Sequence, residues 1–161
     1  MTADPVPPRV AVVCGSPVEA EAMSQVGAML ARFGVPYEEA TISPYRSPRA
    51  LADWMAHLES RGIEVVIAGG GLNASLAGVV ASHVTVPVIG VPLRGGAVGG
   101  IEALLTMAQM PAGVPVAVVG LGHAVNAAVL AVQILAVADP ALRVRLTTFK
   151  DDFERAAGLD G

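Results

Sequence analysis

Residues 9–34 read RVAVVCGSPVEAEAMSQVGAMLARFG. The segment opens with an apolar run rich in valine at residues 10–13, which favours a buried strand. Residues 15–17, Gly-Ser-Pro, interrupt this run, and apolar residues then return at a spacing of three to four, as on one face of a helix. Gly34 is a residue type that commonly ends a helix. The segment therefore predicts a strand, a turn and a helix, which together begin a βαβ unit.

The same alternation continues along the rest of the chain. It predicts further strands at residues 37–42, 65–68, 88–91 and 114–119. It predicts further helices at residues 48–58, 74–83, 101–107 and 124–138. Apolar strands separated by helices are typical of a parallel sheet covered on both faces. We therefore expect an α/β fold, a flavodoxin-like three-layer α/β/α domain with a five-stranded parallel sheet.

The length of 161 residues suits one domain with short additions at its ends. Three prolines near the start predict a disordered lead-in over residues 1–8. The α/β domain is expected over residues 9–140, where the dipeptide Asp139-Pro140 interrupts the last apolar helix. Residues 141–161 carry most of the late charges, and we expect them to form a helical tail that packs on a neighbouring subunit.

The composition limits the classes of partner. Ten Lys and Arg against fourteen Asp and Glu give a net charge of -4, and the one lysine and nine scattered arginines offer no cationic face for nucleic acid. Hydrophobic residues make up 53% of the chain, and the mean hydropathy is +0.61. Because no apolar run is uninterrupted for long enough to cross a bilayer, we expect no membrane partner. The surplus apolar surface instead predicts a homo-oligomer.

Cysteine and histidine usage points away from several chemistries. Cys14 is the single cysteine, which excludes a disulfide framework, and the N-terminus has no signal-peptide pattern, so we expect a cytoplasmic location. His57, His83 and His123 have no partners at metal-ligand spacing, so we expect neither a metal nor a cofactor. The motifs G-x-S-x-G, H-E-x-x-H and G-x-x-x-x-G-K-[ST] are missing, which disfavours hydrolase triads, zincins and P-loop nucleotide hydrolysis.

The loops that follow the predicted strands are where a ligand would bind, because such sheets bind ligands outside the carboxyl ends of their strands. Ser16 either helps to hold a phosphate or only caps the following helix. Arg46 either binds two phosphate oxygens or lies exposed in a solvated loop. The glycines at 69–71 either allow close backbone approach to a ligand or only shape a turn. Arg94 brings a second guanidinium to the same edge.

Six segments carry a resemblance to a known family, and the run QMPAGVPV at residues 109–116 is the most specific of them. The others are residues 15–16, 46–48, 68–71, 86–92 and 126–135. Over nearly its whole length the chain resembles the aminoimidazole ribonucleotide carboxylases of purine biosynthesis, whose bacterial form is the N5-carboxyaminoimidazole ribonucleotide mutase. The resemblance implies an enzyme for carboxyl transfer, carboxylation or decarboxylation of an aminoimidazole-type ribonucleotide. It also implies flavodoxin-like subunits assembled into a homo-octamer.

The resemblance further implies roles for individual residues. It assigns the ribonucleotide phosphate to Gly15, Ser16, Ser43 and Arg46, the ribose to Glu19, and the imidazole ring to Gly70 and Gly71. Leu72 and Arg94 belong to the same expected substrate-binding set.

Two departures fall on the family's catalytic positions, and they mark the chain as a divergent member. The family loop Ser-Ala-His-Arg-Thr-Pro places a proton-shuttling His where this chain has Tyr45, and Ser75 replaces the His of Gly-Gly-Ala-Ala-His-Leu-Pro-Gly. A phenol, with an ordinary pKa of about 10, is a weaker base at pH 7 than imidazole. Because Tyr45 and Ser75 stand at the positions of these histidines, we nevertheless expect Tyr45 to act as the acid and base and Ser75 to be its hydrogen-bonding partner. Val18-Glu19 replaces Ser-Asp, and Arg94-Gly95 replaces Gln-Ser, so the ligand itself is open to change.

Three interpretations stay open on the sequence alone. The protein acts on an imidazole-type ribonucleotide or a close analogue, which the retained scaffold and phosphate loop favour. Alternatively, the pocket has been recruited to a different small molecule in specialised metabolism, as Val18, Leu72 and Arg94 suggest. In the third, the subunit binds a nucleotide or a partner protein without chemistry, because both family histidines are missing.

Overall fold

The computed structural model describes residues 6–156 and residue 158, so most of the lead-in and the last residues of the tail lie outside the described residues. Five parallel strands form one sheet in the order β2-β1-β3-β4-β5. The strands are β1 (Val10–Cys14), β2 (Tyr37–Thr41), β3 (Val65–Gly70), β4 (Val88–Pro92) and β5 (Ala117–Val118). This is the flavodoxin-like strand order, and it confirms the predicted fold class.

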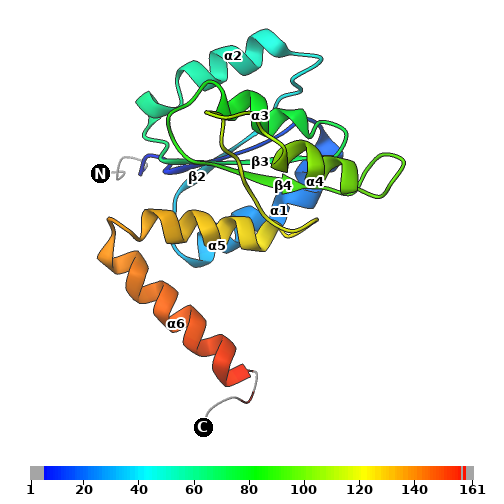
Figure 1. Ribbon diagram of the computed structural model, residues 1–161. Coiled ribbons are helices and arrows are strands. Elements are labelled where there is room, and N and C mark those ends of the chain that lie inside the picture. Colours follow the sequence, from blue (N-terminus) through cyan, green and yellow to red (C-terminus); the bar gives the residue numbers. More distant parts are fainter. Residues whose placement is uncertain (1–5, 157, 159–161) are drawn as a thin grey trace.

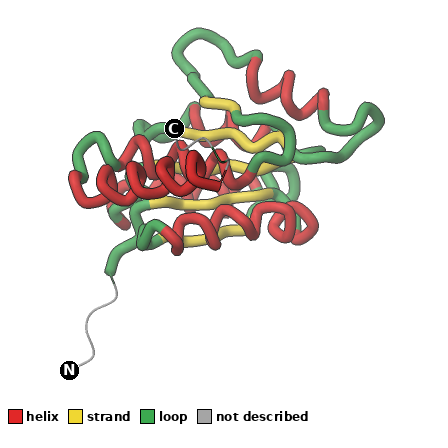
Figure 2. Tube along the Cα trace, turned by 90° about the horizontal axis from the view of Figure 1, so that it is seen from below, coloured by secondary structure: helices red, strands yellow, loops and turns green. Residues whose placement is uncertain are grey.

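Helices cover both faces of the sheet (Figure 1). The helices are α1 (Pro17–Arg32), α2 (Pro48–Ala56), α3 (Ser75–Ala81), α4 (Ile101–Ala108), α5 (Ala124–Leu135) and α6 (Pro140–Ala156), with a short 3-10 turn at Glu59–Arg61. One core contains buried residues of α1, α5 and α6, and the other contains buried residues of α2, α3 and α4. Figure 2 shows the helices running alongside the strands, as expected of a three-layer α/β/α domain.

Alternation along β1 divides its side chains between the two cores. Val10 and Val12 lie in the core with α1 and α5, whereas Ala11 and Val13 lie in the core with α2 and α3. Every residue of β1 is buried, because helices cover both faces of the strand and β2 and β3 pair along its two edges. This is why its sequence reads as a continuous apolar run and not as an alternating one.

Most predicted boundaries differ from the structure by one or two residues, and two elements near the end of the sheet differ by more. The strand expected at residues 114–119 is reduced to β5, since Pro115 has no N–H to donate and only residues 117–118 pair with β4. The helix expected to reach residue 138 ends at Leu135, and the chain continues in bonds of the 3-10 type, such as that from Val137 N–H to the Ile134 carbonyl. Ser47 stands at the N-cap position of α2 and makes no side-chain capping bond.

The connection between β4 and α4 needs its glycines. Gly96, Gly99 and Gly100 have φ angles of +75°, +71° and +102°, in the left-handed region that side chains with a Cβ rarely adopt. A Cβ on Gly100 would also lie 2.9 Å from the Leu93 carbonyl oxygen. The loop leads from Arg94 to α4, so these glycines allow it to return to the sheet beside the carboxyl end of β4.

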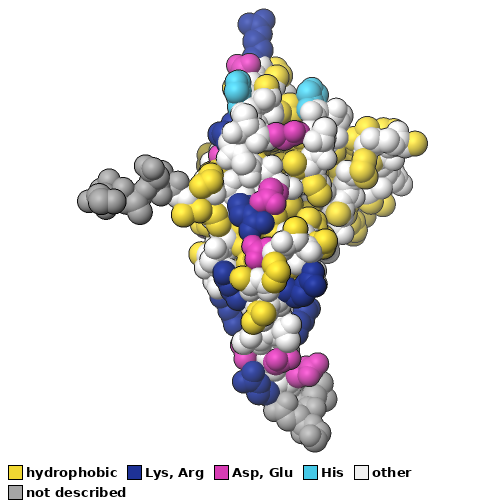
Figure 3. All heavy atoms as spheres, turned by 90° about the vertical axis from the view of Figure 1, so that its left-hand side faces the viewer, with side chains coloured by type: hydrophobic (Ala, Val, Ile, Leu, Met, Phe, Trp, Pro, Cys, Tyr) yellow, Lys and Arg dark blue, Asp and Glu magenta, His cyan; other side chains and the backbone are white. Residues whose placement is uncertain are grey.

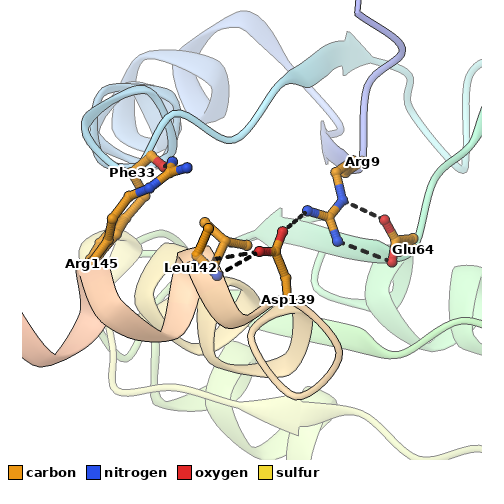
Figure 4. Close-up of polar contacts among 7 residues, drawn as sticks. Arg9, Phe33, Glu64, Asp139, Leu142 and Arg145 are labelled. Carbon is orange, nitrogen blue, oxygen red and sulfur yellow. Dashed lines mark hydrogen bonds and ion pairs between the residues drawn. The ribbon is translucent and has the colours of Figure 1, made fainter.

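Helix α6 extends away from the sheet as an arm beyond α5 (Figure 1). Figure 3 shows acidic and basic side chains gathered on this arm. Its base is held by Asp139, whose carboxylate accepts bonds from the Leu142 N–H at 3.1 Å and from the Arg9 guanidinium at 2.8 Å. Arg9 also pairs with Glu64, and Arg145 donates to the Phe33 carbonyl (Figure 4). The arm is thus attached at its first turns to the starts of β1 and β3 and to the end of α1.

No helix within the described part of the chain has both the length and the apolar character required to span a bilayer.

Candidate functional site

The loops after β1, β2, β3 and β4 meet around a cavity of about 430 Å³ at the carboxyl edge of the sheet. After β1 the chain passes to β2 on one side, whereas β3 lies on the other, so this edge is the switch point where ligands of such folds bind. The cavity is lined by Ser16, Val18, Glu19, Ser43, Tyr45, Arg46, Gly71, Leu72, Asn73, Arg94 and Gly95. Eight of the predicted site residues therefore lie together, and three others, Gly15, Gly70 and Ser75, adjoin the lining.

The loop after β2 is shaped by a serine hydroxyl. The Oγ of Ser43 accepts bonds from the backbone N–H groups of Tyr45, at 3.3 Å, and Arg46, at 3.2 Å. This arrangement turns the chain so that both following side chains line the cavity. The Arg46 guanidinium is exposed and has no carboxylate partner among residues 6–156. It is thus available to an anion.

The loop after β1 caps α1 through Ser16. Its Oγ accepts the N–H of Glu19 at 3.4 Å and donates to the Glu19 carboxylate at 3.1 Å. The helix-capping interpretation of Ser16 is therefore confirmed. Because Ser16 also lines the cavity, its predicted contact with a phosphate stays a prediction.

Glu19 is the buried charged side chain of the described residues, with 8% of its surface exposed. Its Oε1 accepts the backbone N–H of Gly71 at 2.9 Å. Its Oε2 accepts the backbone N–H of Gly15 at 3.0 Å and the side-chain amide of Asn73 at 3.0 Å, in addition to Ser16. The carboxylate thus joins the loop after β1 to the loop after β3. An ionised carboxylate has about four acceptor positions, two on each oxygen, and Oε1 uses one of its two for the Gly71 N–H. Its other position is open to a ribose hydroxyl, so the predicted ribose contact of Glu19 stays a prediction.

Tyr45 and Ser75 are brought into direct contact. Their hydroxyl oxygens lie 2.6 Å apart, and either group is able to donate. Tyr45 is exposed and lines the cavity, whereas Ser75 is half-buried at the first position of α3. The two residues that are expected to carry the chemistry therefore form one hydrogen-bonded pair beside the cavity.

The opening of the cavity combines apolar and cationic groups. Val18 is 78% exposed and Leu72 is 74% exposed, so both side chains face solvent at the opening. Arg94 is exposed on the same lining and has no ionic partner in the described residues. With Arg46, it gives the opening two free guanidinium groups. A ligand with two anionic groups fits this charge.

Two of the predicted glycines lie beside the cavity without lining it. A Cβ on Gly15 would lie 2.5 Å from the Asn73 Cγ, and a Cβ on Gly70 would lie 2.7 Å from the Asn73 carbonyl oxygen. Glycine is needed at both positions to admit Asn73. Their predicted contacts with the phosphate and the ring stay predictions.

Asn73 is a site residue that the sequence did not single out. It lines the cavity and donates to Glu19, a residue 54 positions away. Its single sequence signal was an amide side chain in the loop after the third strand, which is too common in loops to indicate a partner.

The remaining reactive side chains lie elsewhere. None of His57, His83 and His123 lines this cavity, and no group of three metal-ligating side chains occurs in the part of the chain that the structure describes. Burial raises the pKa of the Cys14 thiol, which contacts Thr41 and the Ser16 carbonyl and does not line the cavity.

A comparison with family models identifies the chain. The model of AIR carboxylase matches residues 9–156, which is nearly the whole sequence. The chain belongs to the AIR carboxylase family. Within this family, it is 45% identical over 144 residues to the N5-carboxyaminoimidazole ribonucleotide mutase of Mycobacterium tuberculosis H37Rv, covering 89% of this chain and 83% of that protein. The mutase of Pyrococcus horikoshii is 41% identical over 148 residues, covering 92% and 84%.

Solved structures agree with the fold of this AIR carboxylase family member. Treponema denticola PurE superposes with a TM-score of 0.86 at 21% identity, covering 95% of this chain and 96% of that one. A single-residue variant of PurE2 from the same organism gives a TM-score of 0.87 at 20% identity, with 96% of both chains covered. The expectation of a divergent member is not confirmed, because identities of 39–45% to the mutases extend over most of the chain.

Proposed function

We propose that the protein interconverts N5-carboxyaminoimidazole ribonucleotide and its carbon-carboxylated isomer, with Tyr45 as the acid and base. The observation that carries this proposal is the 2.6 Å contact between the Tyr45 and Ser75 hydroxyls at a cavity with a free guanidinium. The relatives named as N5-carboxyaminoimidazole ribonucleotide mutases supply the substrate class.

The reaction requires a proton transfer that this pair is equipped to perform. Moving the carboxyl group breaks a nitrogen–carbon bond and forms a carbon–carbon bond, so the ring carbon loses one proton and the amine gains one. Tyr45 takes and returns that proton, and Ser75 holds the phenol oxygen through the shared hydrogen bond. A positioned side chain contributes about 10²- to 10⁴-fold to such a step.

Phosphate binding falls to the loops after β1 and β2. The Arg46 guanidinium has no ionic partner within residues 6–156, and the hydroxyls of Ser16 and Ser43 share its cavity. A guanidinium binds two phosphate oxygens at once, which fixes the ligand's orientation as well as its affinity. Gly15 lies in the same loop as Ser16, and Gly70 and Gly71 lie at the end of the neighbouring strand β3, where the ring would pack.

A second candidate is supported by the opening of the cavity. Arg94, Val18 and Leu72 differ from the family pattern, and all three line the cavity. A pocket recruited to a different carboxylated small molecule would use this same arginine and these apolar side chains. In the third interpretation, the subunit is not catalytic and binds a nucleotide or a partner protein. Ribonucleotide binding without turnover would favour it.

Assembly and location form part of the proposal. We infer a homo-oligomer, an octamer as the family resemblance implies, with α6 packing on a neighbouring subunit. The exposed apolar side chains Val137, Val144 and Phe153 at the end of α5 and on α6 support it. A cytoplasmic location accords with the single cysteine.

The deciding experiment is turnover by the purified protein. N5-carboxyaminoimidazole ribonucleotide and its carbon-carboxylated isomer are incubated separately with the protein, and products are separated by chromatography beside a buffer blank. Conversion above the blank, lost in Tyr45→Phe, supports the proposal. Absence of conversion by a folded oligomer that still binds the ribonucleotide overturns it in favour of the alternatives.

A further inference from the structure

We propose that Glu19 is a positioning residue: together with Asn73 it holds the loop after β3 so that Ser75 reaches Tyr45. This inference rests on the proposed function for its kinetic consequence. It concerns five residues, the Glu19 cluster, which are Gly15, Ser16, Glu19, Gly71 and Asn73.

All four hydrogen-bond donors to the buried Glu19 carboxylate come from two loops, the one after β1 and the one after β3. Glu19 is 8% exposed, and four donors reach it: the N–H groups of Gly15 and Gly71, the Ser16 hydroxyl and the Asn73 amide. A buried carboxylate is costly unless it is hydrogen bonded, so the bonds hold the loops at one separation. The residues on the two sides of this contact are 52 and 54 positions apart in the sequence.

The carboxylate occupies donors that a ligand anion would otherwise use. Backbone N–H groups in the loop before a helix form a common anion site, and here Gly15 N–H points at Glu19 instead. An incoming phosphate would have to displace a buried charge from its partners. The phosphate is therefore directed away from the Gly15 N–H and toward the Arg46 guanidinium, with the hydroxyls of Ser16 and Ser43 beside it in the cavity.

Close packing joins Asn73 to the first loop. A Cβ on residue 15 would lie 2.5 Å from the Asn73 Cγ and 2.7 Å from its amide nitrogen. Gly15 thus makes room for the amide that Glu19 binds. The three residues Gly15, Glu19 and Asn73 depend on one another sterically and through hydrogen bonds.

The cluster is connected to the Tyr45–Ser75 pair through the start of α3. The Gly71 carbonyl accepts the Ala74 N–H at 3.2 Å, and the Asn73 carbonyl accepts the Leu76 N–H at 2.9 Å. Ser75 lies between Ala74 and Leu76, whose N–H groups make these two bonds, and its hydroxyl oxygen lies 2.6 Å from that of Tyr45. A displaced loop after β3 therefore displaces Ser75.

The test compares Glu19→Gln and Asn73→Ala with the wild type, using Glu21→Gln as the matched control on the exposed face of α1. An amide at position 19 turns one acceptor into a donor that faces N–H groups. We expect kcat to fall about 10- to 100-fold, since small misplacements at a reacting centre have effects of this size, while KM for N5-carboxyaminoimidazole ribonucleotide changes less than about threefold. We expect faster amide hydrogen exchange in residues 70–76 of both variants and no change in Glu21→Gln.

A swap of the two groups provides the rescue. The double variant Glu19→Gln/Asn73→Asp restores an amide–carboxylate bond between the loops, and we expect it to recover part of the kcat lost in each single variant. A raised KM with unchanged kcat in Glu19→Gln overturns the positioning role in favour of direct ribose contact. Unchanged exchange in residues 70–76 overturns it whatever the activity. An inactive wild type whose variants still show faster exchange overturns the proposed function and retains the Glu19 cluster.

Discussion

The hydroxyl oxygens of Tyr45 and Ser75 lie 2.6 Å apart, although 30 positions separate the residues in the sequence. Tyr45 follows β2 and Ser75 begins α3, which follows β3, and these two strands lie on opposite sides of β1. The pair therefore spans the end of the central strand β1, where the cavity opens. The contact is the feature on which the proposed chemistry of this family member depends.

Replacing Tyr45 by Phe removes the proposed acid and base while keeping the ring. We expect kcat to fall about 10²- to 10⁴-fold with the Kd for the ribonucleotide nearly unchanged. Steady-state kinetics and calorimetry measure the two quantities. Tyr37→Phe is the matched control, because Tyr37 is the other tyrosine of the chain and does not line the cavity. Full activity of Tyr45→Phe would exclude the phenol from proton transfer.

Replacing Arg46 by Ala removes a free guanidinium from the phosphate end of the cavity. A charge-assisted hydrogen bond contributes about 1.5–3 kcal/mol, so we expect the Kd for 5-aminoimidazole ribonucleotide to rise about 10- to 100-fold. Isothermal calorimetry tests this, with Arg49→Ala on the exposed side of α2 as control. Equal affinities of wild type and Arg46→Ala would remove Arg46 from the site.

Replacing Arg94 by Gln, the residue type of the family pattern, tests the second anionic group of the ligand. We expect affinity for the carboxylated ribonucleotide to weaken about 10-fold or more, and affinity for the uncarboxylated 5-aminoimidazole ribonucleotide to change little. The comparison of two ligands on one variant separates a lost ion pair from a distorted cavity. Loss of both affinities together would contradict a role in recognising the carboxylate.

We expect acid to weaken the attachment at the base of α6. The Leu142 N–H and then the Arg9 guanidinium lower the pKa of Asp139, so its ionised form is favoured in the folded state. The resulting stabilisation is present above the unfolded pKa of about 4 and is lost as the pH falls through the lower folded pKa. Asp139→Asn keeps the helix cap but not the charge, and we expect its stability deficit in urea unfolding to shrink from about pH 6 toward about pH 2. The control is Glu154→Gln, and a deficit independent of pH would refute the prediction.

Light scattering tests the assembly. We expect a mass above that of a dimer, since the chain has 53% hydrophobic and 15% charged residues. Val144 is 67% exposed on α6, and Val144→Asp is expected to lower the mass by placing a charge in the subunit contact. Ser60→Asp adds the same charge at an exposed position of the 3-10 turn Glu59–Arg61, outside α6, and serves as the control. A monomeric wild type would refute the prediction.

Much of the architecture was predictable because local sequence patterns determine local structure. The apolar run of β1 and the Ser16 cap of α1 are encoded within a few residues. The length of β5 is overestimated from the sequence, because strand pairing is not determined by local pattern. Residues 114–119 have a strand-like composition, but pairing is a relation between strands, and Pro115 limits it.

The class of fold, the family resemblance and the edge of the sheet at which a ligand is expected follow from periodicity and from the loops after the strands, so they can be inferred from local sequence. Which side chains meet at that edge depends on how the backbone packs in three dimensions. Glu19 with Gly71 and Asn73, and Tyr45 with Ser75, are joined by hydrogen bonds across strands that are distant in sequence. Hydrogen bonds act over about 3 Å and have directions, so they are specified by the packed backbone and not by the spacing of residues along the chain.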